Sequence, residues 1–212
     1  MGGVSSASAV VRRLGILGGT FDPPHYGHLV LAENARTQLS LDRVLFVLAG
    51  QPPHKHSRPI AAAQHRLSMV EAAISDNAFF VTSRVDLDRP GPHYTVDMLA
   101  LLHDEYPQAE LYFLMGGDSL TEFPHWYNAP GILDQTRLAV MPRPGYDPDL
   151  IVLERVLPGI RKHVAWLDVP YLDIASTELR QRVHKGLPLR YIVPSAVDRY
   201  VREHELYTGE SV

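Results

Sequence analysis

Short apolar runs alternate along the chain with stretches whose apolar residues recur every three or four positions. A continuous apolar run is typical of a strand buried on both faces, whereas the second spacing is typical of a helix packed on a core. The predicted strands are 13–17, 44–48, 79–82, 111–115, 138–141 and 164–167. The predicted helices are 26–39, 61–75, 95–103 and 149–156, with two more that begin near Ser176 and at Ser195. Thr95 is the predicted cap of the third helix. This alternation predicts an α/β fold: a doubly wound parallel sheet of five or six strands with helices on both faces.

The length of the chain fits one domain. It has 212 residues, and a domain typically holds roughly 150. The first residues are rich in glycine, serine and alanine. We expect residues 1–11 to be a disordered N-terminal segment, 12–205 to form a single domain and 206–212 to be a flexible tail.

Composition narrows the functional class. A formal net charge of −4 disfavours a nucleic-acid partner, whose phosphates bind basic surfaces. The lack of cysteine excludes a disulfide-stapled fold and thiolate chemistry. No apolar run approaches the ~18 residues that a membrane span needs. We therefore expect a cytoplasmic protein with no nucleic-acid or membrane partner, and the sequence leaves a homo-oligomer open.

Residues 18–28, which read GGTFDPPHYGH, connect the first predicted strand to the first predicted helix. Glycines at such a turn let the backbone approach a ligand, and the following helix offers N–H groups to an anion. His25 and His28 are three residues apart, so both rings lie on one helix face and can donate to phosphate oxygens. The alternatives are a surface turn or a metal pair. Two histidines are too few for a catalytic zinc site, which usually takes three protein ligands.

A second anion site is predicted at residues 174–180, which read IASTELR. Ser176 or Thr177 would cap a new helix, and Arg180 falls one turn later, where its guanidinium can fork onto phosphate oxygens. The alternative is a capped surface helix with an exposed arginine.

A third element, Gly116-Gly117-Asp118, ends the fourth strand. In an open parallel sheet, ligands bind at the carboxyl ends of strands where the winding direction reverses. A strand order of 3-2-1-4-5 would place Gly18 opposite Gly117 across that crevice. Asp118 suits ribose hydroxyls there, or it caps the next helix.

Residues 18–28 resemble the (H/T)xGH signature of the nucleotidyltransferases, and in full they resemble GGTFDPPHxGH of the nicotinate-mononucleotide adenylyltransferases. Residues 174–180 are similar to that family's ISSTxxR element, with Ala175 in place of the first serine. The resemblance implies a Rossmann-like fold and transfer of AMP from ATP to nicotinate mononucleotide in NAD biosynthesis. It also implies that His25, His28 and Arg180 are catalytic. The implied ATP-binding residues are Gly18, Gly19, Thr20, Phe21, Gly117, Asp118, Arg143, Ser176 and Thr177.

Three further elements of that family have counterparts here: PPHK, SYT and a tryptophan after GxDSL. They imply that Asp22, Lys55, Tyr94, Thr95 and Trp126 bind the acceptor, although His93 stands where serine is usual. No protein metal ligand is implied, and Mg²⁺ would arrive with ATP. The alternatives are another HxGH-type enzyme, specific for nicotinamide mononucleotide, phosphopantetheine or a cytidylyl donor, and a catalytically silent nucleotide sensor.

Overall fold

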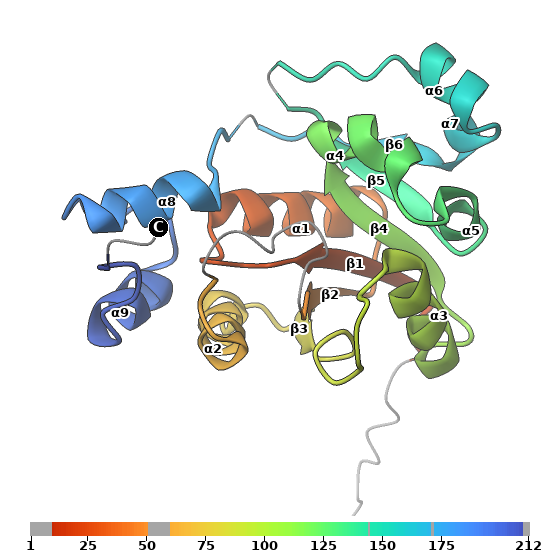
Figure 1. The fold of residues 1–212 in the computed structure, drawn as a ribbon. Coiled ribbons are helices and arrows are strands. Elements are labelled where there is room, and N and C mark those ends of the chain that lie inside the picture. The colour runs from red at the N-terminus through yellow and green to blue at the C-terminus, as the bar shows by residue number, and fades with distance from the viewer. Residues whose placement is uncertain (1–9, 51–59, 144, 171, 210–212) are drawn as a thin grey trace, which may run out of the picture.

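The structure, a computed structural model of the chain, describes residues 10–50, 60–143, 145–170 and 172–209. Its centre is a six-stranded sheet in which every neighbouring pair of strands is parallel. The strands are β1 (Arg13–Gly19), β2 (Arg43–Leu48), β3 (Phe80–Ser83), β4 (Glu110–Gly116), β5 (Arg137–Met141) and β6 (Val164–Trp166). Their order is β3-β2-β1-β4-β5-β6 (Figure 1), so the predicted Rossmann-like sheet is confirmed, and its first and fourth strands are neighbours.

Helices connect the strands. They are α1 (Tyr26–Gln38), α2 (Ala63–Ile74), α3 (Thr95–Glu105), α4 (Gly117–Glu122), the 3₁₀ helix η1 (Phe123–His125), α5 (Ala129–Leu133), α6 (Leu150–Val156), α7 (Ile160–His163), α8 (Ser176–His184) and α9 (Ser195–Glu203). Sequence reasoning left α4, η1, α5 and α7 unassigned. Each is six residues or shorter, too short to show a helical period.

Two apolar cores lie on opposite faces of the sheet, because successive strand residues point to opposite sides. In β1, Leu17 packs into the core shared with α1 and α2, whereas Ile16 packs into the core shared with α3 and α5. The helices α8 and α9 join the first core through Leu179 and Val197, and Figure 1 shows both beside α1 and α2, away from α3. Helices therefore cover both faces, as predicted.

The end of the described chain packs against the first core. Leu206 and Tyr207 fall in the segment expected to be a flexible tail, and both contact buried residues of that core. In the part of the chain that the structure describes, no helix is long and apolar enough to cross a membrane.

Arg66 lies on the buried side of α2 and is only 3% exposed. Its guanidinium donates to the carbonyl oxygens of Thr20, Ala49 and Gly50 at 3.0, 2.9 and 3.2 Å. A further bond goes to the carbonyl oxygen of Ala61 at 3.1 Å. Thr20 follows β1 and Ala49 follows β2, so one side chain ties the ends of two strands to α2. Burial lowers the pKa of Arg66, and the charge of Asp22 partly offsets that effect.

Replacing Arg66 with methionine should lower the free energy of unfolding by about 3 kcal/mol, because four partly buried carbonyl oxygens lose a charged donor. Urea unfolding followed by circular dichroism measures the change. Arg84→Met is the matched control: Arg84 pairs with Asp88 on the surface, so that variant should keep the wild-type midpoint. If Arg66→Met also kept the wild-type midpoint, the guanidinium would not be holding the strand ends.

Candidate active site

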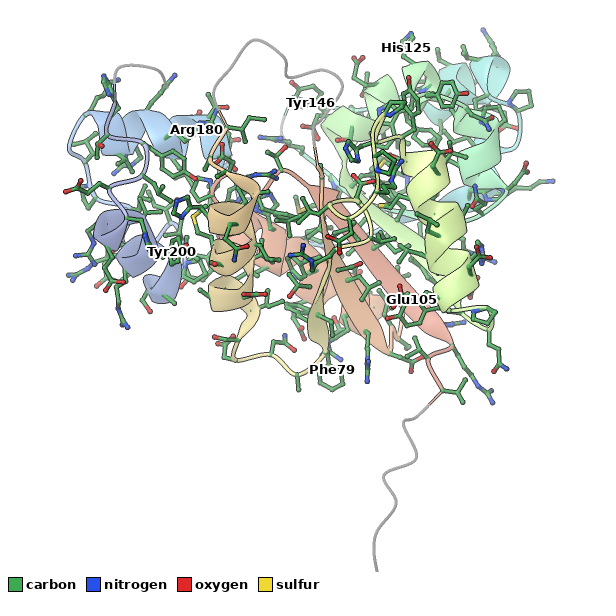
Figure 2. The ribbon with its side chains drawn as sticks, turned by 60° about the horizontal axis from the view of Figure 1, so that its bottom comes forward. Phe79, Glu105, His125, Tyr146, Arg180 and Tyr200 are labelled. Carbon is green, nitrogen blue, oxygen red and sulfur yellow. The ribbon has the colours of Figure 1, made fainter. Side chains whose placement is uncertain are left out.

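Two adjoining pockets open at the edge of the sheet where the strands end. The large pocket, of about 660 Å³, lies between the ends of β1 and β4 and the starts of α1 and α8. The small pocket, of about 470 Å³, lies between the ends of β1 and β2 and the start of α3. Figure 2 shows Arg180 and His125, which line the large and the small pocket, at one edge of the molecule, and Phe79 and Glu105 at the opposite edge.

The end of β1 separates the two pockets. Gly18 and Thr20 line both of them, as do Phe113 of β4 and Trp126, which follows η1. A Cβ at position 18 would make an ordinary van der Waals contact with the Phe113 ring at 3.5 Å. Two ligands could therefore meet at the end of β1.

His25 and His28 stand at the start of α1 in the large pocket. As their spacing predicts, the rings lie side by side, with centroids 3.8 Å apart. The backbone N–H of His25 donates to Nδ1 of His28 at 3.1 Å. A neutral His28 ring must therefore carry its hydrogen on Nε2, which makes Nε2 a donor. Nδ1 of His25 is buried and has no partner among the described residues.

Both imidazoles are neutral near pH 7. Burial, with a smaller contribution from the charge of Arg143, lowers the pKa of His25 to about 4. Burial, reinforced by His25, lowers the pKa of His28 well below its ordinary value of 6.5. A neutral ring still donates one N–H, and a bound anion raises the pKa of a histidine beside it.

The loop between β1 and α1 holds these rings in place. Phe21 has a left-handed backbone (φ 50°), its side chain is 2% exposed, and its ring meets that of His28 edge-on at 5.1 Å. A Cβ on Gly27 would approach Nδ1 of His25 to 3.0 Å. Glycine at 27 therefore lets the His25 ring fold over the helix start.

The start of α8 lies across the large pocket from α1. Its N-cap residue is Ala175, which makes no side-chain cap, so the prediction that Ser176 or Thr177 caps this helix is wrong. The Ser176 hydroxyl instead donates to the Pro23 carbonyl oxygen at 2.9 Å, which ties α8 to the β1–α1 loop. The N–H groups of the first turn of α8 are then left for a ligand.

Arg180 points from α8 toward the same loop. Its Nη1 donates to the Asp22 carbonyl oxygen at 2.8 Å and lies 3.8 Å from Oδ2 of Asp22. Its Nη2 donates to the Thr177 hydroxyl at 3.3 Å. Its Nε is buried and has no partner among the described residues.

The end of β4 completes the large pocket. Gly116 and Asp118 line it, whereas Gly117, which the sequence pointed to, is the buried first residue of α4. The Asp118 carboxylate accepts from Nη1 of Arg143 at 2.6 Å. A Cβ at position 116 would collide with this carboxylate. Asp118 and Arg143, two of the residues that the family resemblance assigns to ATP, thus pair with each other here.

The small pocket is aromatic. Tyr94, Thr95 and Trp126 line it together, and the Tyr94 ring stacks on that of Tyr127 at 4.1 Å. Thr95 is the first residue of α3 and Tyr94 is its N-cap, with no side-chain cap, so the prediction that Thr95 caps this helix is wrong. The backbone N–H groups in the first turn of α3 are therefore available at the wall of the small pocket.

The loop before α3 has a buried ionic support. Asp86, 5% exposed, accepts from Nε of Arg89 at 2.8 Å. The Arg89 guanidinium also donates to the carbonyl oxygens of Pro92 and Tyr94. His93, which replaces the family's serine, lines the small pocket, with Nδ1 3.7 Å from Oδ1 of Asp86.

Most of the site residues predicted from sequence line the same pocket. The large pocket contains Gly18, Thr20, Phe21, Asp22, His25, His28, Asp118, Arg143, Ser176, Thr177 and Arg180. Asp22, expected beside the acceptor, lies in the large pocket only, whereas Gly19 lines the small one. Lys55 lies outside the described residues. Sequence reasoning missed Arg66 and Tyr207. Arg66 could have been found, because it falls in helical register with apolar Met69.

Among the described residues, no group of three or more histidine, cysteine, aspartate or glutamate side chains is arranged to hold a metal ion. A glycine turn with paired imidazoles faces a second helix start that carries an arginine, which is the arrangement expected from the resemblance to the nucleotidyltransferases.

Comparisons with known proteins identify the family. The family model described as cytidylyltransferase-like matches residues 16–182. A Thermomicrobium roseum protein named "Probable nicotinate-nucleotide adenylyltransferase" is 49% identical over 93% of this chain and 92% of its own length. A Desulfitobacterium hafniense protein of the same name is 44% identical over 94% of this chain and 98% of its own. The chain therefore belongs to the cytidylyltransferase-like family and, within it, to the nicotinate-nucleotide adenylyltransferases.

Solved structures share the fold. The Plasmodium falciparum nicotinic acid mononucleotide adenylyltransferase complexed with NaAD matches with a TM-score of 0.76 at 18% identity, covering 92% of this chain and 97% of that one. The same protein complexed with APC matches with a TM-score of 0.74.

The lowered pKa of His25 should make the fold acid-sensitive. Between pH 6.5 and about 4, the unfolded chain binds a proton at His25 that the folded chain does not, so stability is lost as the pH falls through this window. The His25 contribution to that loss is about 3 kcal/mol. His25→Gln should remove this part of the loss, as measured by urea unfolding at several pH values.

His125→Gln is the control, because the His125 side chain is 80% exposed. In this variant the free energy of unfolding should depend on pH as it does in wild type. A His25→Gln variant that lost stability as steeply as wild type between pH 6.5 and 4 would contradict a neutral buried His25.

Proposed function

We propose that the protein transfers AMP from ATP to nicotinate mononucleotide, forming nicotinate adenine dinucleotide and pyrophosphate in NAD biosynthesis. The observation that carries this proposal is the pair of pockets that meet at Gly18 and Thr20. One pocket has the groups that bind phosphates, and the other has aromatic walls and a helix start. The names of the relatives support the same reaction.

ATP belongs in the large pocket. Its phosphates would lie between the starts of α1 and α8, where His25, His28 and Arg180 can donate to them. Its ribose would lie at Asp118, which would then share its carboxylate between a hydroxyl group and Arg143. This arrangement places the α-phosphorus near the end of β1, beside the small pocket.

Nicotinate mononucleotide belongs in the small pocket. Trp126 offers a face or edge for the pyridine ring. The ring carboxylate would accept hydrogen bonds from the free N–H groups of α3 and from the Thr95 hydroxyl. Contact between Lys55 and the acceptor phosphate stays a prediction.

In the reaction, an oxygen of the acceptor phosphate attacks the α-phosphorus of ATP. The bond from that phosphorus to the oxygen bridging the α- and β-phosphates breaks, and pyrophosphate leaves with the electron pair. The attacking oxygen is already anionic, so no general base is needed. Positioning two bound reactants can contribute roughly 7–11 kcal/mol, and one well-placed donor roughly 3 kcal/mol. Neutral imidazole N–H groups suit the donor role, because they need no proton from solvent.

Mg²⁺ fits this site as a companion of ATP. Asp22 and Asp118 already bond Tyr207 and Arg143, so the large pocket offers few free carboxylate ligands. Mg²⁺ commonly keeps several waters and binds through substrate phosphates. When bound, it would shield phosphate charge.

Replacing His28 with alanine should lower the rate of pyrophosphate release about 100-fold, because a donor to the phosphates is lost. A coupled pyrophosphate assay with ATP and nicotinate mononucleotide measures the rate, and thermal unfolding serves as the folding control. Unchanged release in a folded His28→Ala variant would refute this use of the site. If wild type released no pyrophosphate at all, the sensor alternative would be favoured.

Replacing Thr95 with valine should raise KM for nicotinate mononucleotide about tenfold, because the ring carboxylate loses a hydroxyl donor at constant side-chain volume. KM for ATP should stay within about twofold, since Thr95 lines only the small pocket. Thr37→Val, on the exposed side of α1, is the control. Steady-state rates with the nicotinamide form should change less, because an amide has no full negative charge. An equal change for both acceptors would place the carboxylate elsewhere.

A further inference from the structure

Tyr207 reaches back across the fold to the β1–α1 loop. Its hydroxyl donates to Oδ1 of Asp22 at 2.7 Å, although 185 residues separate the two in sequence. Asp22 is 3% exposed. Burial and the neighbouring Asp22 carboxylate raise the pKa of Tyr207, so its hydroxyl keeps its proton and stays a donor.

The same aspartate holds Arg180. The Asp22 backbone carbonyl accepts from Nη1 of Arg180 at 2.8 Å, and its Oδ2 lies 3.8 Å from that nitrogen. Buried Arg66 also interacts electrostatically with Asp22. One carboxylate thus interacts with two guanidinium groups and one phenol. The phenol bonds Oδ1, while Oδ2 lies toward Arg180.

The backbone of Tyr207 indicates that its position is constrained. Its φ is 66°, a left-handed conformation that is unfavourable for a residue other than glycine. Its ring packs on the first core, and its hydroxyl also lies 3.9 Å from Sδ of Met69 in α2. The Arg180 guanidinium lies near enough for its charge to act on the Tyr207 hydroxyl.

We propose that Tyr207 is a positioning residue of the phosphate site: its hydroxyl fixes the Asp22 carboxylate and thereby aims the Arg180 guanidinium into the large pocket. Tyr207 is absent from the wall of that pocket, so it acts through Asp22 rather than on substrate. This inference rests on the proposed function, because its effect appears in AMP transfer.

Tyr207→Phe tests it by removing only the hydroxyl. We expect kcat for pyrophosphate release to fall about tenfold, with KM for nicotinate mononucleotide within about twofold, because the loss acts on transition-state phosphate charge. Tyr200→Phe is the matched control. The Tyr200 hydroxyl bonds His65 of α2 rather than Asp22, so kcat of this variant should stay at the wild-type value.

A double variant distinguishes an effect of Tyr207 on the position of Arg180 from an effect on the stability of the fold. If Tyr207 acts through Arg180, the Tyr207→Phe change should cost less than about twofold in an Arg180→Lys background, since the guanidinium it aims is gone. Thermal unfolding of every variant confirms that each is folded at the assay temperature. If Tyr207→Phe does not fold, Asp22→Asn, which keeps an oxygen acceptor for the hydroxyl, should show the same fall in kcat.

Three results would overturn the inference: wild-type kcat in Tyr207→Phe, an undiminished tenfold fall in the Arg180→Lys background, or wild-type kcat in Asp22→Asn. A wild-type protein that released no pyrophosphate with either mononucleotide would instead refute the proposed function. The two failures are therefore distinguishable.

Discussion

The parallel pairing of β1 with β4 is the constraint on which both pockets depend. The register pairs Ile16 with Phe113, so both strands run to the same edge and end within one crevice. Parallel pairing also sends the next helix away from each strand end with its N–H groups facing that edge. The motif after β1 and the aspartate after β4 can therefore face one nucleotide. An antiparallel neighbour would present a strand start there, without a helix.

The basic side chains of the large pocket are either neutral or paired with acceptors in the ligand-free protein. The two imidazoles are neutral because burial removes the water that a charged ring would need. The two guanidinium groups of the pocket stay charged, and each is held by an acceptor: Arg143 by the Asp118 carboxylate and Arg180 by the Asp22 carbonyl oxygen. A triphosphate would meet donors that are already oriented, so little reorganisation would be needed when it binds.

The sheet and the residues around its first strand could be predicted from sequence, because continuous apolar runs and the glycine turn are local signals. The phosphate-facing residues of the large pocket follow from two short motifs, and Asp118 follows from the glycine turn after the fourth strand and the strand order. What could not be predicted depends on long-range packing. Nothing near position 207 indicates that its hydroxyl meets Asp22. The cap of α8 was misjudged because Ser176 bonds Pro23 instead, a partner supplied by another part of the chain.

The two departures from the family pattern have different physical consequences. Ala175 is the N-cap of α8, and the anion site there depends on backbone N–H groups, which alanine supplies as well as serine does. His93 is different, because its side chain lies in the wall of the small pocket beside Asp86. Asp86 is also bound by Arg89, so the ionic support of the loop does not depend on His93 alone. Substitution at 93 can therefore change what the acceptor touches, whereas substitution at 175 leaves the backbone N–H groups of the anion site in place.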